Sequence, residues 1–257
     1  MTRRAVEGRA TATGQRAPDA ARAAGYNSRV VRTTGPLAIA IDGPSVSGKG
    51  TVARAIAEAL GYRHVDTGAM YRAVGWRAIQ LGVPLDDEGR VAAVAEAATF
   101  DLSAGRVVID GSDVTVAIRT PEIDRAASAV ARLPQVRRAL VARQRALAAA
   151  GAIVMEGRDI GTVVLPDADV KIYLDATAEE RARRRATDPA HTGQRTGFDR
   201  VSVEMRARDE LDGTRAASPL VKADDAILLD TTGVTVGDVV RRALAIVERA
   251  AQRPRSR

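Results

Sequence analysis

Residues 43–49 read Gly-Pro-Ser-Val-Ser-Gly-Lys, with four residues between the first glycine and the Gly-Lys pair. This spacing predicts a phosphate-binding loop, or P-loop, because backbone N–H groups in such a loop and the N-terminus of the next helix attract phosphate oxygens. Lys49 is expected to reach the β- and γ-phosphates of ATP. The residues predicted to bind ATP are Gly43, Pro44, Ser45, Val46, Ser47, Gly48, Lys49, Gly50 and Thr51.

The residues after Lys49 are Gly50 and Thr51, where many P-loops have Ser or Thr directly after the lysine. This GKGT form is the one seen in nucleoside monophosphate kinases. GTPases, ATPases, transporters and small-molecule kinases all have P-loops, so the acceptor of the phosphoryl group must be inferred from other residues.

Arginines follow several of the predicted strands, and arginine suits phosphate because its planar guanidinium donates two parallel hydrogen bonds. Arg72 ends the run DTGAMYR, and Arg158 lies in EGRD directly after a short apolar run. A mononucleotide acceptor carries a dianionic phosphate, which needs several fixed cations to approach ATP. These arginines predict such an acceptor.

Two further groups of charges lie near the C-terminal half. Arg208, Asp212 and Arg215 have the i, i+4, i+7 spacing of one helix face, although a solvated ion-pair face has the same spacing. Arg181 and Arg185 precede TDPAHTGQRTGF, a Gly- and Thr-rich stretch that predicts a mobile lid at about residues 186–200. The predicted catalytic residues are Lys49, Arg158, Arg181 and Arg185.

The elements that must position these residues alternate along the chain. The apolar runs LAIAID (37–42), AIVM (152–155), VKIYL (170–174) and AILL (226–229) predict buried parallel strands. Long Ala- and Arg-rich helical segments separate them, which predicts an α/β fold with a central parallel sheet. Residues 100–116 contain two strand-like pieces around Asp110-Gly111, a hairpin signal that predicts a small β insertion.

The composition excludes several classes of site and protein. The chain has no cysteine, so it has neither disulfides nor thiolate metal ligands. It has no apolar run long enough to cross a membrane. Residues 1–36 carry seven arginines and two acidic residues, and residues 251–257 carry three more arginines, so the net charge of +7 belongs to the ends. Residues 37–250 are nearly neutral, and with few aromatic side chains this argues against a nucleic-acid partner.

Residues 1–36 are predicted to be a disordered basic extension, and 251–257 a basic tail. An organellar transit peptide would have a similar Arg-rich composition.

Six blocks of sequence, in order, resemble bacterial cytidylate kinases: GPSVSGKGT, DTGAMYR, IRTPEI, EGRDIGTVV, VKIYLDATAEERARRR and RDELDGTRAASPL. The resemblance implies a P-loop kinase domain over 37–250, with an acceptor-side insert at about 98–135. It implies phosphorylation of CMP and dCMP by ATP, with Mg²⁺ bound through ATP and no dedicated metal site. Val46-Ser47 departs from the family, which often has two small residues there.

The resemblance also implies roles for individual residues. Arg72, Arg158 and Arg215 match the residues that hold the acceptor phosphate, and Ser128, Arg137 and Asp159 match those that read cytosine. The implied CMP-binding set is Thr67, Tyr71, Arg72, Ser128, Arg137, Arg158, Asp159, Arg208, Asp212 and Arg215. A cytoplasmic monomer is expected.

Two other functions remain open on the residues alone. One is a kinase for UMP, AMP or a non-nucleotide acceptor such as shikimate. The other is a P-loop switch or a nucleic-acid-associated ATPase, although the sequence has no Asn-Lys-x-Asp stretch that would read guanine.

Overall fold

The computed structural model describes residues 35–103, 105–187, 198–215 and 218–252. Most of the predicted basic extension, of the basic tail and of the predicted lid therefore lies outside the described residues. Among the described residues, no helix has the length and apolar character needed to cross a membrane.

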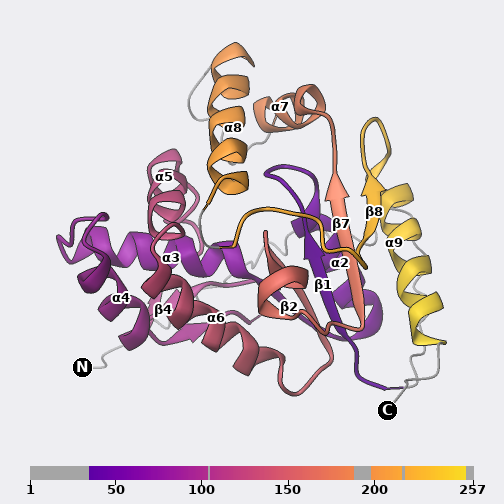
Figure 1. The fold of residues 1–257 in the computed structure, drawn as a ribbon, viewed down its shortest axis with the longest axis horizontal. Coiled ribbons are helices and arrows are strands. Elements are labelled where there is room, and N and C mark those ends of the chain that lie inside the picture. The colour runs from indigo at the N-terminus through magenta and orange to yellow at the C-terminus, as the bar shows by residue number, and fades with distance from the viewer. Residues whose placement is uncertain (1–34, 104, 188–197, 216–217, 253–257) are drawn as a thin grey trace, which may run out of the picture.

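A five-stranded parallel sheet forms the centre of the fold, with strand order β2-β6-β1-β7-β8. This confirms the predicted α/β class. Figure 1 shows the carboxyl ends of β1 and β7 pointing toward α7 and α8, with α9 along one side. The strands are β1 (Ala38–Asp42), β2 (Arg63–Asp66), β6 (Ile153–Glu156), β7 (Val170–Asp175) and β8 (Ile227–Asp230).

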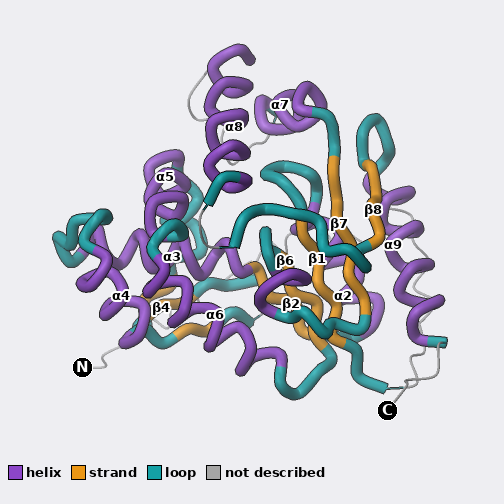
Figure 2. Tube along the Cα trace, viewed as in Figure 1, coloured by secondary structure: helices purple, strands orange, loops and turns teal. Residues whose placement is uncertain are grey.

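Helices cover both faces of this sheet, as the tube in Figure 2 shows. The helices are α2 (Lys49–Leu60), α3 (Thr67–Gln80), α4 (Glu88–Ala97), α5 (Pro121–Val130), α6 (Pro134–Ala148), α7 (Ala178–Ala186), α8 (Phe198–Gly213) and α9 (Val236–Ala251), with the π-helical turn η1 (Ile160–Val164).

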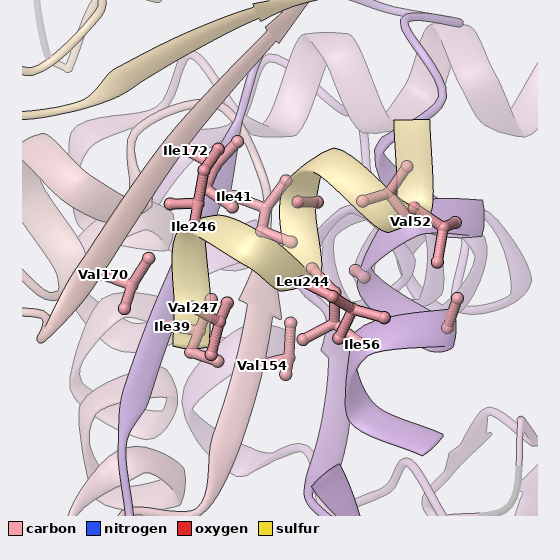
Figure 3. Packing of buried hydrophobic residues seen from close by; sticks show 14 of the residues in the cluster. Ile39, Ile41, Val52, Ile56, Val154, Val170, Ile172, Leu244, Ile246 and Val247 are labelled. Atoms are coloured by element: carbon pink, nitrogen blue, oxygen red, sulfur yellow. The ribbon is translucent and has the colours of Figure 1, made fainter. Parts of the chain in front are cut away.

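The period-2 alternation of the strands decides which side chains face which helices. Ile39 and Ile41 of β1 point to one face and pack, fully buried, against α2 and α9 (Figure 3). Ala40 points to the other face, where Met155 and Val164 of η1 lie in a second core cluster. Both faces of β1 are therefore apolar, as the run LAIAID predicts.

The predicted β insertion is a three-stranded antiparallel sheet of β3 (Phe100–Asp101), β4 (Val108–Ile109) and β5 (Ser112–Asp113). Asp110 and Gly111 both have positive φ, of 49° and 78°, which is the backbone of a type I′ hairpin turn. Ile109 and Val114 pack against α3 in a core of their own. The insertion thus rests on the helix that carries Tyr71 and Arg72.

Candidate active site

A cavity of about 930 Å³ lies at the carboxyl ends of the parallel strands, where ligands bind in open α/β sheets. It brings the P-loop and the predicted acceptor residues to one space, although they are far apart in the sequence. The predicted residues that line it are Ser45, Val46, Ser47, Gly48, Lys49, Gly50, Thr51, Thr67, Tyr71, Arg72, Ser128, Arg158, Asp159, Arg185, Arg208, Asp212 and Arg215. Gly43, Pro44, Arg137 and Arg181 are not among the lining residues.

The P-loop joins the end of β1 to the start of α2. Gly48 is the N-cap of α2 and has a φ of 96°, and neither it nor an acidic residue in the first turn satisfies the helix N-terminus. The free N–H groups and the helix dipole there favour an anion. A side chain at Gly43 would place its Cβ 2.0 Å from the carbonyl oxygen of Leu174, so the loop starts in contact with β7.

Lys49 is buried and curls back over the loop. Its Nζ donates to the carbonyl oxygen of Pro44 at 2.5 Å and lies 3.5 Å from Oγ of Ser47. Burial, with the nearby positive charge of Arg158, lowers the pKa of Lys49 well below its ordinary value. Phosphate oxygens in the loop would stabilise its charged form instead.

Val46 adopts a left-handed backbone, with a φ of 62°. A β-branched residue rarely has this conformation, because Cβ crowds the carbonyl oxygen. The side chain packs against Ala182 of α7 and Met205 of α8. The bulk of Val46 therefore contacts the helices on either side of the predicted lid.

The acceptor arginines lie opposite the P-loop, each beside a carboxylate. Nη2 of Arg72 is 2.8 Å from Oδ2 of Asp66, and Nε of Arg158 is 3.0 Å from Oδ2 of Asp212. Burial would raise the pKa of Asp212, but the charges of Arg158 and Arg215 outweigh burial and hold it below its ordinary value. The cluster is therefore built from ionised pairs.

The prediction that Arg208, Asp212 and Arg215 share one helix face was wrong for Arg215. Helix α8 ends at Gly213, and Arg215 lies two residues beyond it. Its Nε donates to the carbonyl oxygen of Asp212 at 3.3 Å, and this carbonyl at the helix end also accepts the backbone N–H of Leu220 at 2.8 Å. Glycine disfavours helix continuation, and the chain turn directs Arg215 back into the cavity.

Of the predicted base-reading residues, Arg137 and Asp159 are buried and Ser128 is partly buried. Arg137 pairs with Asp159, and its guanidinium lies 5.7 Å from the centre of the Tyr71 ring. Burial raises the pKa of Tyr71 to about 12, so its hydroxyl is neutral. Thr67 donates to the carbonyl oxygen of Glu156 at 2.7 Å, and Ser128 donates to that of Asp124 at 3.1 Å.

Arg181 and Arg185 occupy different positions. Arg181 is buried behind the P-loop, where it donates to the carbonyl oxygen of Ser45 at 3.3 Å and pairs with Asp209 of α8. Arg185 lines the cavity and pairs with Asp124 of α5. Arg181 therefore stabilises the P-loop through its backbone, whereas Arg185 faces the cavity in which phosphates would lie.

Sequence reasoning missed several polar residues of the site. Arg184 donates to the hydroxyl and the carbonyl oxygen of Thr231, and the Thr231 hydroxyl lies 3.2 Å from the carbonyl oxygen of Ser47. Nε2 of His64 lies 2.9 Å from Oε1 of the buried Glu156. Each of these contacts joins segments that are distant in sequence, so no local sequence pattern predicts them.

Asp42 was also missed, although it directly precedes the P-loop. Its two carboxylate oxygens accept from the backbone N–H groups of Ile160 and Gly161 at 2.8 and 2.7 Å. Burial raises the pKa of Asp42 to about 6. This carboxylate ties β1 to the turn that follows Arg158 and Asp159.

No group of three or more His, Cys, Asp or Glu side chains in the described part of the chain could hold a metal ion.

A family model described as cytidylate kinase matches residues 39–249. The chain belongs to the cytidylate kinase family. Three relatives are cytidylate kinases from Desulfitobacterium hafniense (strain Y51), Bacillus licheniformis and Pelotomaculum thermopropionicum. They are 50%, 45% and 49% identical to this chain, cover 82%, 84% and 81% of it, and are themselves covered over 92%, 98% and 95% of their lengths. A gluconokinase from Sinorhizobium meliloti, a solved structure, matches 84% of this chain and 94% of its own length, with a TM-score of 0.44 and 19% identity, a similarity too low to add to the assignment.

The match to cytidylate kinases spans both the P-loop and every predicted acceptor residue. It therefore favours a nucleotide kinase over the P-loop switch and the nucleic-acid-associated ATPase that the residues alone left open.

Proposed function

We propose that this cytidylate kinase transfers the γ-phosphoryl group of ATP to CMP and dCMP, giving ADP with CDP or dCDP. The observation that carries this proposal is the shared cavity, in which the P-loop with Lys49 faces the arginines Arg72, Arg158 and Arg215. Two anion-binding groups in one space fit two phosphate-bearing substrates.

In the proposed reaction, a phosphate oxygen of CMP attacks the γ-phosphorus while the bond to the β,γ-bridging oxygen breaks. The acceptor oxygen is already anionic near neutral pH, so no protein nucleophile or strong base is needed. Phosphoryl transfer passes through a loose, in-line transition state that positioning and charge stabilise. Lys49 and the P-loop N–H groups hold the donor phosphates, Arg72, Arg158 and Arg215 hold the acceptor phosphate, and Arg185 faces the space between them.

Asp159 and Arg137 support the choice of cytosine. A carboxylate accepts from the exocyclic amino group of cytosine, and uracil offers a carbonyl oxygen at the same place, which a carboxylate repels. Arg137 pairs with Asp159 and holds its carboxylate in place. Ser128, from α5, lines the same side of the cavity.

Mg²⁺ bound through ATP fits this site. Gly50 occupies the position at which other P-loops supply a hydroxyl, and the carboxylate of Glu156 lies beside it, with Oε1 3.2 Å from where a Cβ on Gly50 would be. A hard oxygen donor at this place, together with the phosphate oxygens of ATP, is the donor set that Mg²⁺ prefers. The ion would neutralise charge on the transferring group.

A panel of acceptors tests the substrate. We expect ADP release from ATP with CMP and dCMP, much less with UMP, and little with AMP or shikimate. UMP or AMP turned over faster than CMP would contradict the cytosine assignment. ADP release that RNA stimulates and CMP does not would instead favour a nucleic-acid-associated ATPase.

The roles of the other predicted residues, a monomeric state and a cytoplasmic location are also part of the proposal. Light scattering during gel filtration measures the mass of the protein in solution and so tests the monomeric state.

A further inference from the structure

Asp124 lies in the first turn of α5 and faces the cavity. Its Oδ2 accepts from Nη2 of Arg185, on α7, and lies 3.6 Å from Nη1 of Arg208, on α8. The Asp124 side chain is only 13% exposed. One largely buried carboxylate therefore joins three helices.

The acceptor side reaches Asp124 through α5 itself. Ser128 is one turn further along this helix, lines the cavity, and donates its hydroxyl to the carbonyl oxygen of Asp124 at 3.1 Å. A cytidine nucleotide that contacts Ser128 would therefore contact the helix turn that carries Asp124.

The ATP side reaches Asp124 through α7. Arg181 on this helix donates to the carbonyl oxygen of Ser45, in the P-loop. Arg184, next to Arg185, donates to Thr231, whose hydroxyl lies 3.2 Å from the carbonyl oxygen of Ser47. Helix α7 is thus hydrogen-bonded to the P-loop through Arg181 and to Asp124 through Arg185.

We infer that Asp124 is a positioning residue that couples the two nucleotide sites, so that binding of CMP strengthens binding of ATP and the reverse. This inference rests on the proposed function. A nucleotide that orders α5 fixes the carboxylate, which fixes Arg185 and Arg208 where the second nucleotide needs them. Such coupling is reciprocal by thermodynamic necessity.

Two features favour Asp124 over other carboxylates of the cavity. Asp66 pairs with Arg72, six residues along the chain, and Asp212 pairs with Arg158 near the acceptor phosphate, so both act within the acceptor side. Asp124 joins the acceptor insert to α7, which is bonded to the P-loop. Arg208 also needs this counter-charge, since burial and nearby Arg158 both disfavour its charged form.

Calorimetric titration of a non-hydrolysable ATP analogue, with and without saturating CMP, tests the coupling. In the wild type, we expect CMP to lower the Kd of the analogue by about fivefold or more. In Asp124→Asn we expect the Kd of the analogue to be nearly the same with and without CMP, because a neutral amide does not offset the charge of two guanidinium groups. Asp124→Glu keeps the carboxylate and should restore most of the effect.

Glu122→Gln is the matched control. Glu122 and Asp124 are both acidic residues in the first turn of α5, so both favour the helix N-terminus, but Glu122 is exposed. In Glu122→Gln, CMP should lower the Kd of the ATP analogue by the same factor as in the wild type. Should Asp124→Asn not fold, Asp124→Ala serves in its place, since Asp124 lies inside α5, four residues after the N-cap Thr120, and alanine has the highest helix propensity.

Two results would overturn the inference: no effect of CMP on the wild-type Kd, or the same effect in the wild type and in Asp124→Asn. Both leave the proposed function intact provided that CMP binds and is phosphorylated. Failure of the wild type to bind CMP at all would instead count against the proposed function.

Discussion

Carboxylates pair with three arginines of the cavity. Arg72, Arg158 and Arg185 pair with Asp66, Asp212 and Asp124. Pairing offsets the cost of burying each charge and fixes the guanidinium before a phosphate arrives. Phosphate can still bind, because guanidinium has five N–H donors and each pair uses one or two of them.

Arg158→Ala should weaken both CMP binding and turnover, since Arg158 lines the cavity with the P-loop and is proposed to hold the acceptor phosphate. Each lost charged hydrogen bond costs about 1.5–3 kcal/mol, which is a fall of roughly 10- to 150-fold in kcat/KM for CMP. Steady-state kinetics with varied CMP measure this.

Arg241→Ala is the control for this change. Arg241 is 60% exposed on α9 and pairs with Asp238, three residues before it on the same helix. Its loss should leave kcat/KM for CMP unchanged and should change the free energy of unfolding by less than about 1 kcal/mol. Unchanged CMP kinetics in Arg158→Ala would reject the acceptor assignment.

Gly43→Ala should destabilise the protein strongly, because its Cβ would lie 2.0 Å from the carbonyl oxygen of Leu174 and the backbone φ is +147°. Gly82→Ala is the matched variant, with a φ of +62° but nothing within 4 Å of the new Cβ. Gly82→Ala should cost about 1–2 kcal/mol of unfolding free energy, from the left-handed backbone alone. Urea denaturation compares the two, and equal losses would mean that the contact with β7 does not constrain the loop.

At the scale of elements, the site depends on polar contacts between strand ends and turns. Asp42 at the end of β1 accepts two backbone N–H groups of η1, 118 and 119 residues away along the chain. These bonds satisfy buried donors and set the position of the segment that carries Arg158 and Asp159 relative to the P-loop. The Asp42 carboxylate thus sets the position of the P-loop, which is proposed to bind ATP, relative to the segment that is proposed to bind CMP.

The raised pKa of Asp42 predicts a pH-dependent difference in stability between wild type and Asp42→Asn. The folded pKa of about 6 lies above the ordinary value of 3.8, so the folded state binds the proton more tightly than the unfolded state. The stability that the Asp42 group contributes is therefore present below about pH 4 and is lost as pH rises to about 6.

The asparagine side chain of the Asp42→Asn variant does not titrate, so the stability of this variant relative to wild type should improve between pH 4 and pH 7, by at most about 3 kcal/mol. Urea denaturation of both proteins at the two pH values measures the difference. A difference that is constant, or that moves in favour of the wild type, would mean that Asp42 keeps an ordinary or lowered pKa.

At the scale of the whole molecule, the kinase fold contains every residue of the proposed site. The family match covers residues 39–249, and the excess of arginines lies at the two ends of the chain. Tyr62 holds the start of the described chain, since its hydroxyl donates to the carbonyl oxygen of Gly35 and accepts from the N–H of Leu37.

A variant without residues 1–34 should therefore keep the kcat and the KM for CMP of the full chain within about twofold, because its site and the Tyr62 contacts are intact. Parallel assays of both proteins, with and without RNA, measure this. Loss of activity on truncation, combined with stimulation of the full chain by RNA, would favour the nucleic-acid-associated ATPase.

The sequence predicted the fold class and the P-loop, because both depend on local patterns, whereas the resemblance to a family supplied the acceptor residues that line the cavity. Apolar runs identified β1, β6, β7 and β8, and Asp110-Gly111 identified the hairpin. The position of Arg215 was wrong, since the i+7 spacing assumed a helix that Gly213 ends. Arg181 was predicted to be catalytic, but it contacts the carbonyl oxygen of Ser45 and does not line the cavity, a difference of side-chain direction that spacing does not encode.

By itself, the sequence predicted a P-loop after a buried strand, because both need only contiguous residues, and its six ordered blocks pointed to the cytidylate kinases, the family that the match over residues 39–249 shows. Only the tertiary structure decided which carboxylate holds which cation. Asp42, Asp124 and Glu156 received their partners from packing between segments that are 61 to 119 residues apart. The packing of strands and helices fixes these partners, and the spacing of residues within one segment does not predict that packing.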